Sequence, residues 1–132
     1  MDNQIKQILT EASKDLLFPS ESDYPFEYVE WDTGGKKLTK KLIRQLTHKK
    51  TNDPVKSVSL DDFFSNVTEI KDWYGEQEKA NAERFRQLQE VLKNNLANIR
   101  VFKVGKIEID AYMIGTTQDG KCAGLSTKLI ET

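Results

Sequence analysis

The longest uninterrupted helical pattern in the chain runs from Glu76 to Asn98 and reads EQEKANAERFRQLQEVLKNNLAN. Its apolar residues recur at steps of three and four, at Ala82, Phe85, Leu88, Leu92 and Leu96. Residues at these steps share one face of a helix with 3.6 residues per turn. A single helix cannot bury such a face by itself. The pattern therefore predicts a helix over residues 76–98 that packs against other elements.

The strands that follow are expected to cover this face. Residues 106–115 alternate between apolar and charged side chains over much of their length, which is the period of a half-buried strand. Gly105-Lys106 predicts a two-residue type II′ hairpin before this strand, and Asp119-Gly120 predicts a type I′ hairpin after it. Residues 122–130 then predict a final strand. The resulting fold class is α+β, an antiparallel β-sheet with helices packed on it.

The N-terminal third predicts one more helix and one more strand. A helical apolar pattern is formed by Ile5, Ile8, Leu9, Ala12, Leu16 and Leu17. Asp2 or Asn3 is a suitable N-cap for this helix, and Pro19 is expected to end it. Phe26 to Trp31 is rich in aromatic residues and predicts a strand of the same sheet.

The middle of the chain alternates loops with short elements. Residues 36–50 are rich in Lys and Arg, contain no acid, and predict a helix from Thr39 to about Thr47. Residues 55–60 are expected to form a short strand. Ser59, three residues before Asp62, predicts the N-cap of a further helix.

Size and composition set the broad class of the protein. A chain of 132 residues predicts a single domain over residues 1–132 with a core of its own. Charged residues make up 31%, and no apolar run approaches the ~20 residues of a membrane-spanning helix. The polar N-terminus lacks a signal-peptide pattern, and a single cysteine is typical of a reducing compartment. We therefore expect a cytoplasmic protein without a membrane partner.

Residues that carry chemistry are few. The sequence has no Gly-rich phosphate loop, no paired CxxC motif and no HExxH motif. His48 is expected to be a solvated loop residue, and Cys122 a packed thiol at the start of a strand. Asp61 and Asp62 stand at a predicted helix start, where the helix dipole explains them. These residues predict no catalysis and no cofactor.

The basic residues 36–50 leave one alternative function open. Such a run is found in nucleic-acid-binding modules, which have a steep dependence of affinity on salt. The residues between the cations here are aliphatic rather than aromatic, and the net charge is −1. A solvated helix face is therefore the preferred interpretation, and we do not expect direct binding to nucleic acid.

Four blocks of sequence carry a family resemblance. They are LLFPSESDYPFEYVEW from Leu16, DDFFSNVTEIKDWY from Asp61, KVGKIEIDAYMIG from Lys103 and AGLSTKLIET from Ala123. Together these blocks resemble the nuclease A inhibitor (NuiA-like) family of protein inhibitors of sugar-non-specific nucleases. The resemblance implies an α–β–α sandwich and a one-to-one complex that blocks the active site of a Mg²⁺-dependent nuclease. It is weakest between residues 32 and 54.

The resemblance also implies where the nuclease would be contacted. Glu21 matches a glutamate whose carboxylate takes the position of the scissile phosphate. Asp72 and Trp73 match a second contact on the nuclease surface. Thr132 matches a C-terminal threonine whose hydroxyl reaches the catalytic Mg²⁺ of the nuclease, so Thr132 would be a metal ligand only in the complex.

Each of these positions also has an ordinary structural interpretation. Glu21 is one of several acids in a helix-to-strand loop, where a solvated side chain is common. Trp73 precedes a core helix and is suited to packing beneath it. Thr132 is a terminal residue, and most chain ends fray.

Overall fold

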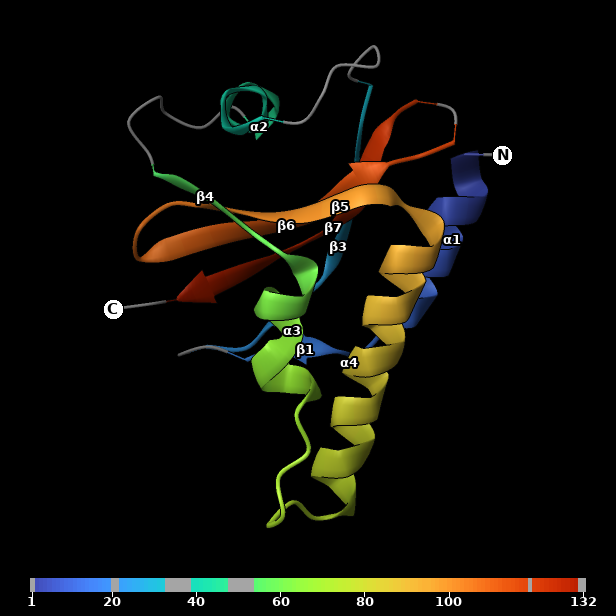
Figure 1. The fold of residues 1–132 in the computed structure, drawn as a ribbon, viewed down its shortest axis with the longest axis vertical. Coiled ribbons are helices and arrows are strands. Elements are labelled where there is room, and N and C mark those ends of the chain that lie inside the picture. The colour runs from blue at the N-terminus through green and yellow to red at the C-terminus, as the bar shows by residue number, and fades with distance from the viewer. Residues whose placement is uncertain (1, 20–21, 33–38, 48–53, 119, 131–132) are drawn as a thin grey trace.

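The computed structural model describes residues 2–19, 22–32, 39–47, 54–118 and 120–130, and within them a five-stranded antiparallel sheet with helices on both faces (Figure 1). The elements in chain order are α1 (Asp2–Ser13), β1 (Leu17–Phe18), β2 (Tyr24–Pro25), β3 (Glu27–Trp31), α2 (Lys40–Thr47), β4 (Val55–Val58), α3 (Leu60–Thr68), α4 (Glu76–Asn95), β5 (Ala97–Val104), β6 (Glu108–Thr116) and β7 (Cys122–Ile130). The strand order is β3-β7-β6-β5-β4. The α+β class is confirmed.

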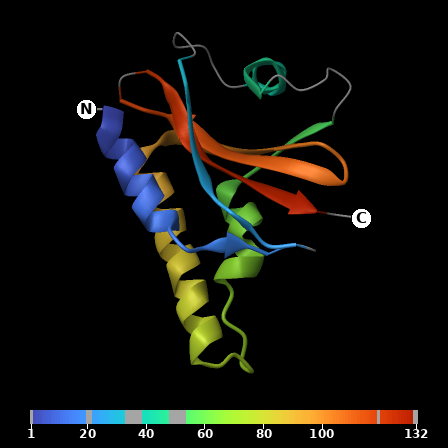
Figure 2. The same ribbon diagram turned by 180° about the vertical axis from the view of Figure 1, so that it is seen from behind.

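The main core lies between this sheet and α1, α3 and α4. The apolar face predicted for α4 is buried there, with Leu88 and Leu92 at 0% exposure. Figure 2 shows α1 running along α4, and the Arg84 Nη2 of α4 donates a hydrogen bond to the Ala12 carbonyl of α1 at 3.4 Å. A group of phenylalanine rings fills the same core, namely Phe18, Phe26, Phe63, Phe64 and Phe85.

A second, smaller core lies on the opposite face of the sheet, under α2. Ile43 of α2 is fully buried there against residues of β4, β5, β6 and β7. Thr39 stabilises the start of α2, because its Oγ1 accepts a hydrogen bond from the Leu42 amide at 3.1 Å. Helices therefore cover both faces, and the predicted α–β–α layering is confirmed (Figure 1).

The helix predicted over residues 76–98 is three residues too long. α4 ends at Asn95, and Leu96 is its extended C-cap. Asn98 has a φ of +53°, and the pairing of β5 with β6 is irregular between Ala97 and Arg100. This local turn lets Leu96 stay in the core while the chain reverses directly into β5.

Both ends of the first helix differ from the prediction. Asp2 is already helical, so an N-cap at Asp2 or Asn3 is wrong. The helix also ends at Ser13, well before Pro19, because Asp15 adopts a φ of +63°. The Ser13 hydroxyl, which donates to the Leu9 carbonyl at 2.9 Å, is bonded back into the last turn.

The chain between α1 and β3 forms a small sheet that the sequence pattern did not predict. β1 and β2 pair antiparallel, with Phe18 opposite Tyr24. Residues 19–23 link the two strands. The Thr127 hydroxyl of β7 donates to the Pro25 carbonyl at 2.9 Å and so ties β2 to the last strand of the main sheet.

Both predicted hairpin turns have the wrong length. Val104 pairs with Asp110 rather than Ile107, so the β5–β6 connection is longer than two residues, although Gly105 does have the positive φ expected of it. The observed register places Val101 opposite Met113 in the main core, whereas a two-residue turn would place it opposite Asp110. The second turn is three residues long and lies between Thr117 and Lys121. The Thr117 amide donates a hydrogen bond to the Lys121 carbonyl at 2.8 Å.

The remaining predicted elements are close to those observed. β3 begins at Glu27 rather than Phe26, and β4 ends at Val58. Ser59 caps α3 as predicted, its Oγ accepting from the Asp62 amide at 3.0 Å. No helix of the described segments is both long enough and apolar enough to cross a membrane.

Candidate nuclease-binding surface

Trp73 lies at the tip of a turn between α3 and α4. The Tyr74 amide donates to the Lys71 carbonyl at 3.0 Å, which makes Asp72 and Trp73 the two central residues of that turn. Both side chains are exposed, and Trp73 is 71% exposed. The interpretation of Trp73 as a residue packed beneath the helix is therefore wrong.

Hydrogen bonds on both sides hold this turn in place. On the α3 side, Arg86 Nε donates to the Thr68 carbonyl at 2.9 Å, at the last residue of the helix. On the α4 side, the Gly75 amide donates to the Glu78 carboxylate at 3.1 Å. Trp73 also packs edge-to-face on Tyr74, with ring centroids 4.8 Å apart. The exposed indole is thus presented from a braced turn.

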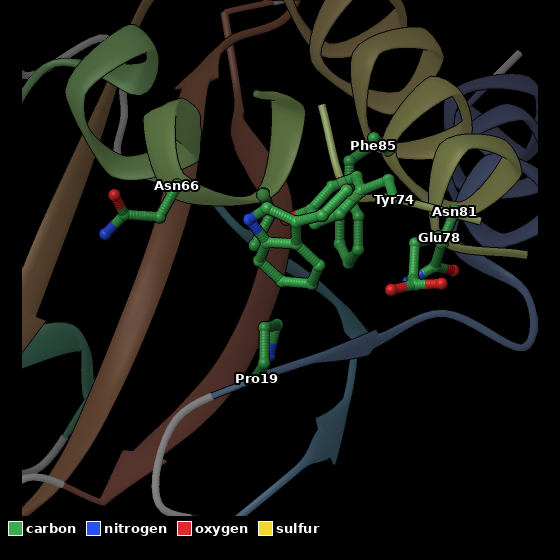
Figure 3. A pocket seen from close by; sticks show the side chains of 9 residues that line it. Pro19, Asn66, Tyr74, Glu78, Asn81 and Phe85 are labelled. Carbon is green, nitrogen blue, oxygen red and sulfur yellow. The ribbon is translucent and has the colours of Figure 1, made fainter. Parts of the chain in front are cut away.

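A pocket of about 260 Å³ opens beside Trp73. Its apolar and aromatic lining comes from Pro19, Val67, Trp73, Tyr74, Ala82 and Phe85. Figure 3 shows Asn66 of α3 on one side and Glu78 and Asn81 of α4 on the other, with Tyr74 and Phe85 between them. Because Pro19 follows β1, the pocket joins the β1–β2 link to the α3–α4 turn.

Two of the predicted contact residues, Glu21 and Thr132, lie outside the described residues. On either side of Glu21, Pro19 lines the pocket, and Pro25 accepts the hydrogen bond from the Thr127 hydroxyl. β7 is described up to Ile130, which pairs with Glu108 of β6.

Comparison with known proteins identifies the family of this chain. The sequence profile named NuiA, described as nuclease A inhibitor-like protein, matches residues 3–132. The chain belongs to the NuiA family. A search among curated proteins gives no match. Membership of the NuiA family implies the role of a nuclease inhibitor rather than that of an enzyme.

The residues of this NuiA-like chain with catalytic potential have structural roles where they are described. Cys122 is buried, and burial raises the pKa of its thiol to about 11, which disfavours the nucleophilic thiolate. Asp61 accepts hydrogen bonds from Lys93 and Gln89, and the bond from Lys93 lowers the pKa of the Asp61 carboxyl. His48 lies outside the described residues.

The basic stretch 36–50 is described only from Thr39 to Thr47. There Ile43 anchors α2 to the second core, while Lys40 and Lys41 are exposed. This arrangement is that of an amphipathic helix with a solvated basic face, as the sequence pattern indicated.

The family resemblance assigned Trp73 to the surface of the NuiA-like chain, whereas the residues alone favoured a core position, and neither indicated the pocket beside it. A spacing signal was nevertheless present within α4, because Glu78, Ala82 and Phe85 follow one another at steps of four and three residues. Side chains at such steps share one helix face.

Proposed function

We propose that this chain is a single inhibitor domain, residues 1–132, that blocks the active site of a Mg²⁺-dependent, sugar-non-specific nuclease in a one-to-one complex. The proposal is supported chiefly by the NuiA family match across residues 3–132. The geometry is consistent with it, because an exposed tryptophan and the residue that precedes the Ser20-Glu21 pair line one pocket. An inhibitor that covers the nuclease active site with such a surface needs no catalytic residues of its own.

In this proposal the Glu21 carboxylate replaces the scissile phosphate. A nuclease site stabilises phosphate charge with cations and hydrogen-bond donors, and the same groups accept a well-placed carboxylate. Strand β2, which begins three residues after Glu21, is attached to β7 by the hydrogen bond from the Thr127 hydroxyl to the Pro25 carbonyl. A carboxylate that is close along the chain to an anchored strand loses less conformational freedom on binding than one on a long loop.

The proposed contact of Thr132 is with the nuclease metal. Mg²⁺ prefers hard oxygen ligands and usually keeps several exchangeable waters, so a neutral hydroxyl can replace one of them. Thr132 follows Ile130 by two residues, and Ile130 is still paired in the sheet. The last strand thereby restricts how far the terminal residue can range.

The central test is a titration of the purified chain into a Mg²⁺-dependent, sugar-non-specific nuclease while DNA degradation is followed. We expect activity to disappear at a one-to-one ratio of chain to nuclease, whatever the DNA concentration. A chain that bound DNA through residues 36–50 would instead protect in proportion to the DNA present and would lose affinity steeply with salt. That second result would contradict the proposal.

Replacing Trp73 by alanine should weaken the complex without unfolding the chain. Exposed aromatic anchors contribute roughly 2 kcal/mol or more at protein interfaces, which is about a 30-fold loss of affinity. Because the indole is 71% exposed and packs edge-to-face on Tyr74, the cost in folding free energy should stay at about 1 kcal/mol or less. Inhibition assays and denaturant unfolding on the same variant measure the two effects.

Trp73→Phe is the graded control, since it keeps an aromatic ring and removes the indole N–H. It should lie between the wild type and Trp73→Ala in potency. Full potency of the alanine variant would remove Trp73 from the contact surface.

Removal of the Thr132 hydroxyl should weaken inhibition with folding intact. Thr132→Val keeps the branched shape and the terminal carboxylate but loses the ligand oxygen, whereas Thr132→Ser keeps the oxygen and should retain potency. Added Mg²⁺ should tighten the wild-type complex more than the valine complex, because only the former gains the metal bond. The measurement is inhibition across a Mg²⁺ series.

A tag placed after Thr132 provides an independent check of the same mechanism. It should reduce potency more than Thr132→Val, because the added chain would have to pass through a closed site. The same tag at the N-terminus should be harmless. A fully potent C-terminally extended chain would exclude the metal contact.

A further inference from the structure

We propose that the pocket beside Trp73 receives an arginine side chain of the nuclease. This inference rests on the proposed function, since it specifies which chemical group of the partner this surface binds. The family resemblance assigns a nuclease contact to Trp73 but no ligand to the pocket beside it.

The shape of the pocket suits a long side chain with a flat head group. Pro19 and Val67 provide accessible apolar surface for a methylene stem, and the buried Ala82 and Phe85 complete the apolar lining. Trp73 and Tyr74 lie nearly perpendicular to each other, at 87°, and give aromatic surface on which a guanidinium plane can stack. The volume of about 260 Å³ is large enough for one such side chain.

The charge of the pocket favours a cation. Among the described residues that line it, Glu78 is the one with a formal charge. Its Oε1 accepts a single backbone hydrogen bond, from Gly75, and a carboxylate has about four acceptor positions in all. Asn66 and Asn81 add amide oxygens to the rim, and Asp72 is exposed on the turn that carries Trp73.

The chemistry of the partner supplies the matching group. Proteins that bind nucleic acids contact phosphates mainly with Arg and Lys, so cationic side chains surround a nuclease active site. Pro19, which lines the pocket, is only two residues before Glu21 along the chain, and Glu21 is the residue proposed to replace the phosphate. Arginine fits better than lysine, because it stacks on aromatic rings, donates in a fork and is less strongly hydrated.

A matched pair of variants tests the charge. Glu78→Gln removes the charge but keeps an oxygen that can accept the Gly75 hydrogen bond, so α4 should remain capped. Glu76→Gln makes the same change of charge in the same helical turn, at a residue that does not line the pocket. We expect Glu78→Gln to weaken nuclease inhibition by about tenfold, the factor for one charged hydrogen bond, and Glu76→Gln to leave it nearly unchanged.

A ligand titration tests the pocket without the nuclease. N-acetylarginine amide, N-acetyllysine amide (with its side-chain ammonium intact) and N-acetylcitrulline amide are added separately while the indole N–H signal of Trp73 is followed by NMR. The arginine derivative should shift this signal saturably in the wild type and only weakly in Glu78→Gln, and the neutral, equally shaped citrulline derivative should have little effect.

The outcomes separate this inference from the proposed function. Equal shifts from arginine and citrulline derivatives, no shift at all, or a preference for the lysine derivative would overturn the arginine pocket. Full inhibition by Glu78→Gln would also overturn it while leaving the inhibitor role intact. A wild-type chain that does not inhibit the nuclease would remove the proposed function, and the NMR titration would still decide the ligand preference of the pocket.

Discussion

Glu21→Gln should weaken inhibition of the nuclease by at least tenfold. In the proposed complex the carboxylate is buried among the cations and donors that normally hold a phosphate. Glutamine keeps the shape of the side chain but leaves those charges without a counter-charge. Removing one partner of such a buried pair costs roughly 2–5 kcal/mol of binding free energy. The inhibition constant of the variant measures this loss directly.

The control for Glu21→Gln is a second acid on the same link. Asp23 is exposed and lies two residues further along, so Asp23→Asn removes one negative charge from nearly the same place. Asp23→Asn should change potency only slightly, because a charge at the edge of the interface affects binding only through long-range electrostatic attraction. Both variants should unfold at the temperature of the wild type. Equal loss of potency in the two would mean that general charge, and not a phosphate-like position, governs binding.

Phe64→Ala should have the largest effect on stability. Phe64 is fully buried, with its ring centroid 6.2 Å from those of Phe18 and Phe85 and 5.7 Å from that of Phe63. Deleting a buried phenyl ring leaves a cavity and costs about 3–5 kcal/mol of unfolding free energy. For a chain of this size that loss lowers the melting temperature by about 10 °C or more. Calorimetry or denaturant unfolding gives the measurement.

Phe64→Leu is the control for this cavity. It keeps much of the apolar volume and should cost clearly less than the alanine change. Below the melting transition, both variants should still inhibit the nuclease at a one-to-one ratio, because Phe64 is not part of the proposed surface. Together with Trp73→Ala, the pair separates residues that stabilise the fold from residues that bind. A stability loss below about 1 kcal/mol for Phe64→Ala would contradict its assignment to the core.

Sequence reasoning predicted the elements that a single local pattern specifies. The period of apolar residues identified α4, and the side chains of Ser59 and Thr39 marked the starts of α3 and α2. Alternation along residues 106–115 identified β6 as a strand, although its second half is buried on both faces, with Met113 in the main core and Ile114 in the second core. These signals depend on residues close together in the chain, so they can be read without knowing what packs against them.

The errors arose where distant residues decide the local structure. The turn at Gly105 is longer than two residues because Val101 must face Met113 across the strands. The small β1–β2 sheet was missed because each of its strands has only two residues and β2 is tied to β7 through Thr127, about a hundred residues away. Neither constraint is present in the local sequence.

The candidate site also combines features that the local sequence specifies with features that depend on distant residues. The exposure of Trp73 depends on how α3 and α4 are joined, and the residues of the Lys71–Tyr74 turn alone are compatible with either a buried or an exposed indole. The pocket needs Pro19 from the β1–β2 link as well as residues of α3 and α4. Glu21 and Thr132 remain predictions from the family resemblance.

The strand order has a consequence for the way this protein is made. β3, which follows the β1–β2 link, enters the main sheet only through β7, and β7 is the last described strand in the order of synthesis. During translation, β3 therefore has no neighbouring strand in the main sheet until β7 has been synthesised. A ribosome that stalls before Cys122, or a protease that removes β7, would leave β3 without its neighbour. In the proposed function, incomplete chains should consequently be inactive as inhibitors, and only molecules translated through β7 should bind the nuclease.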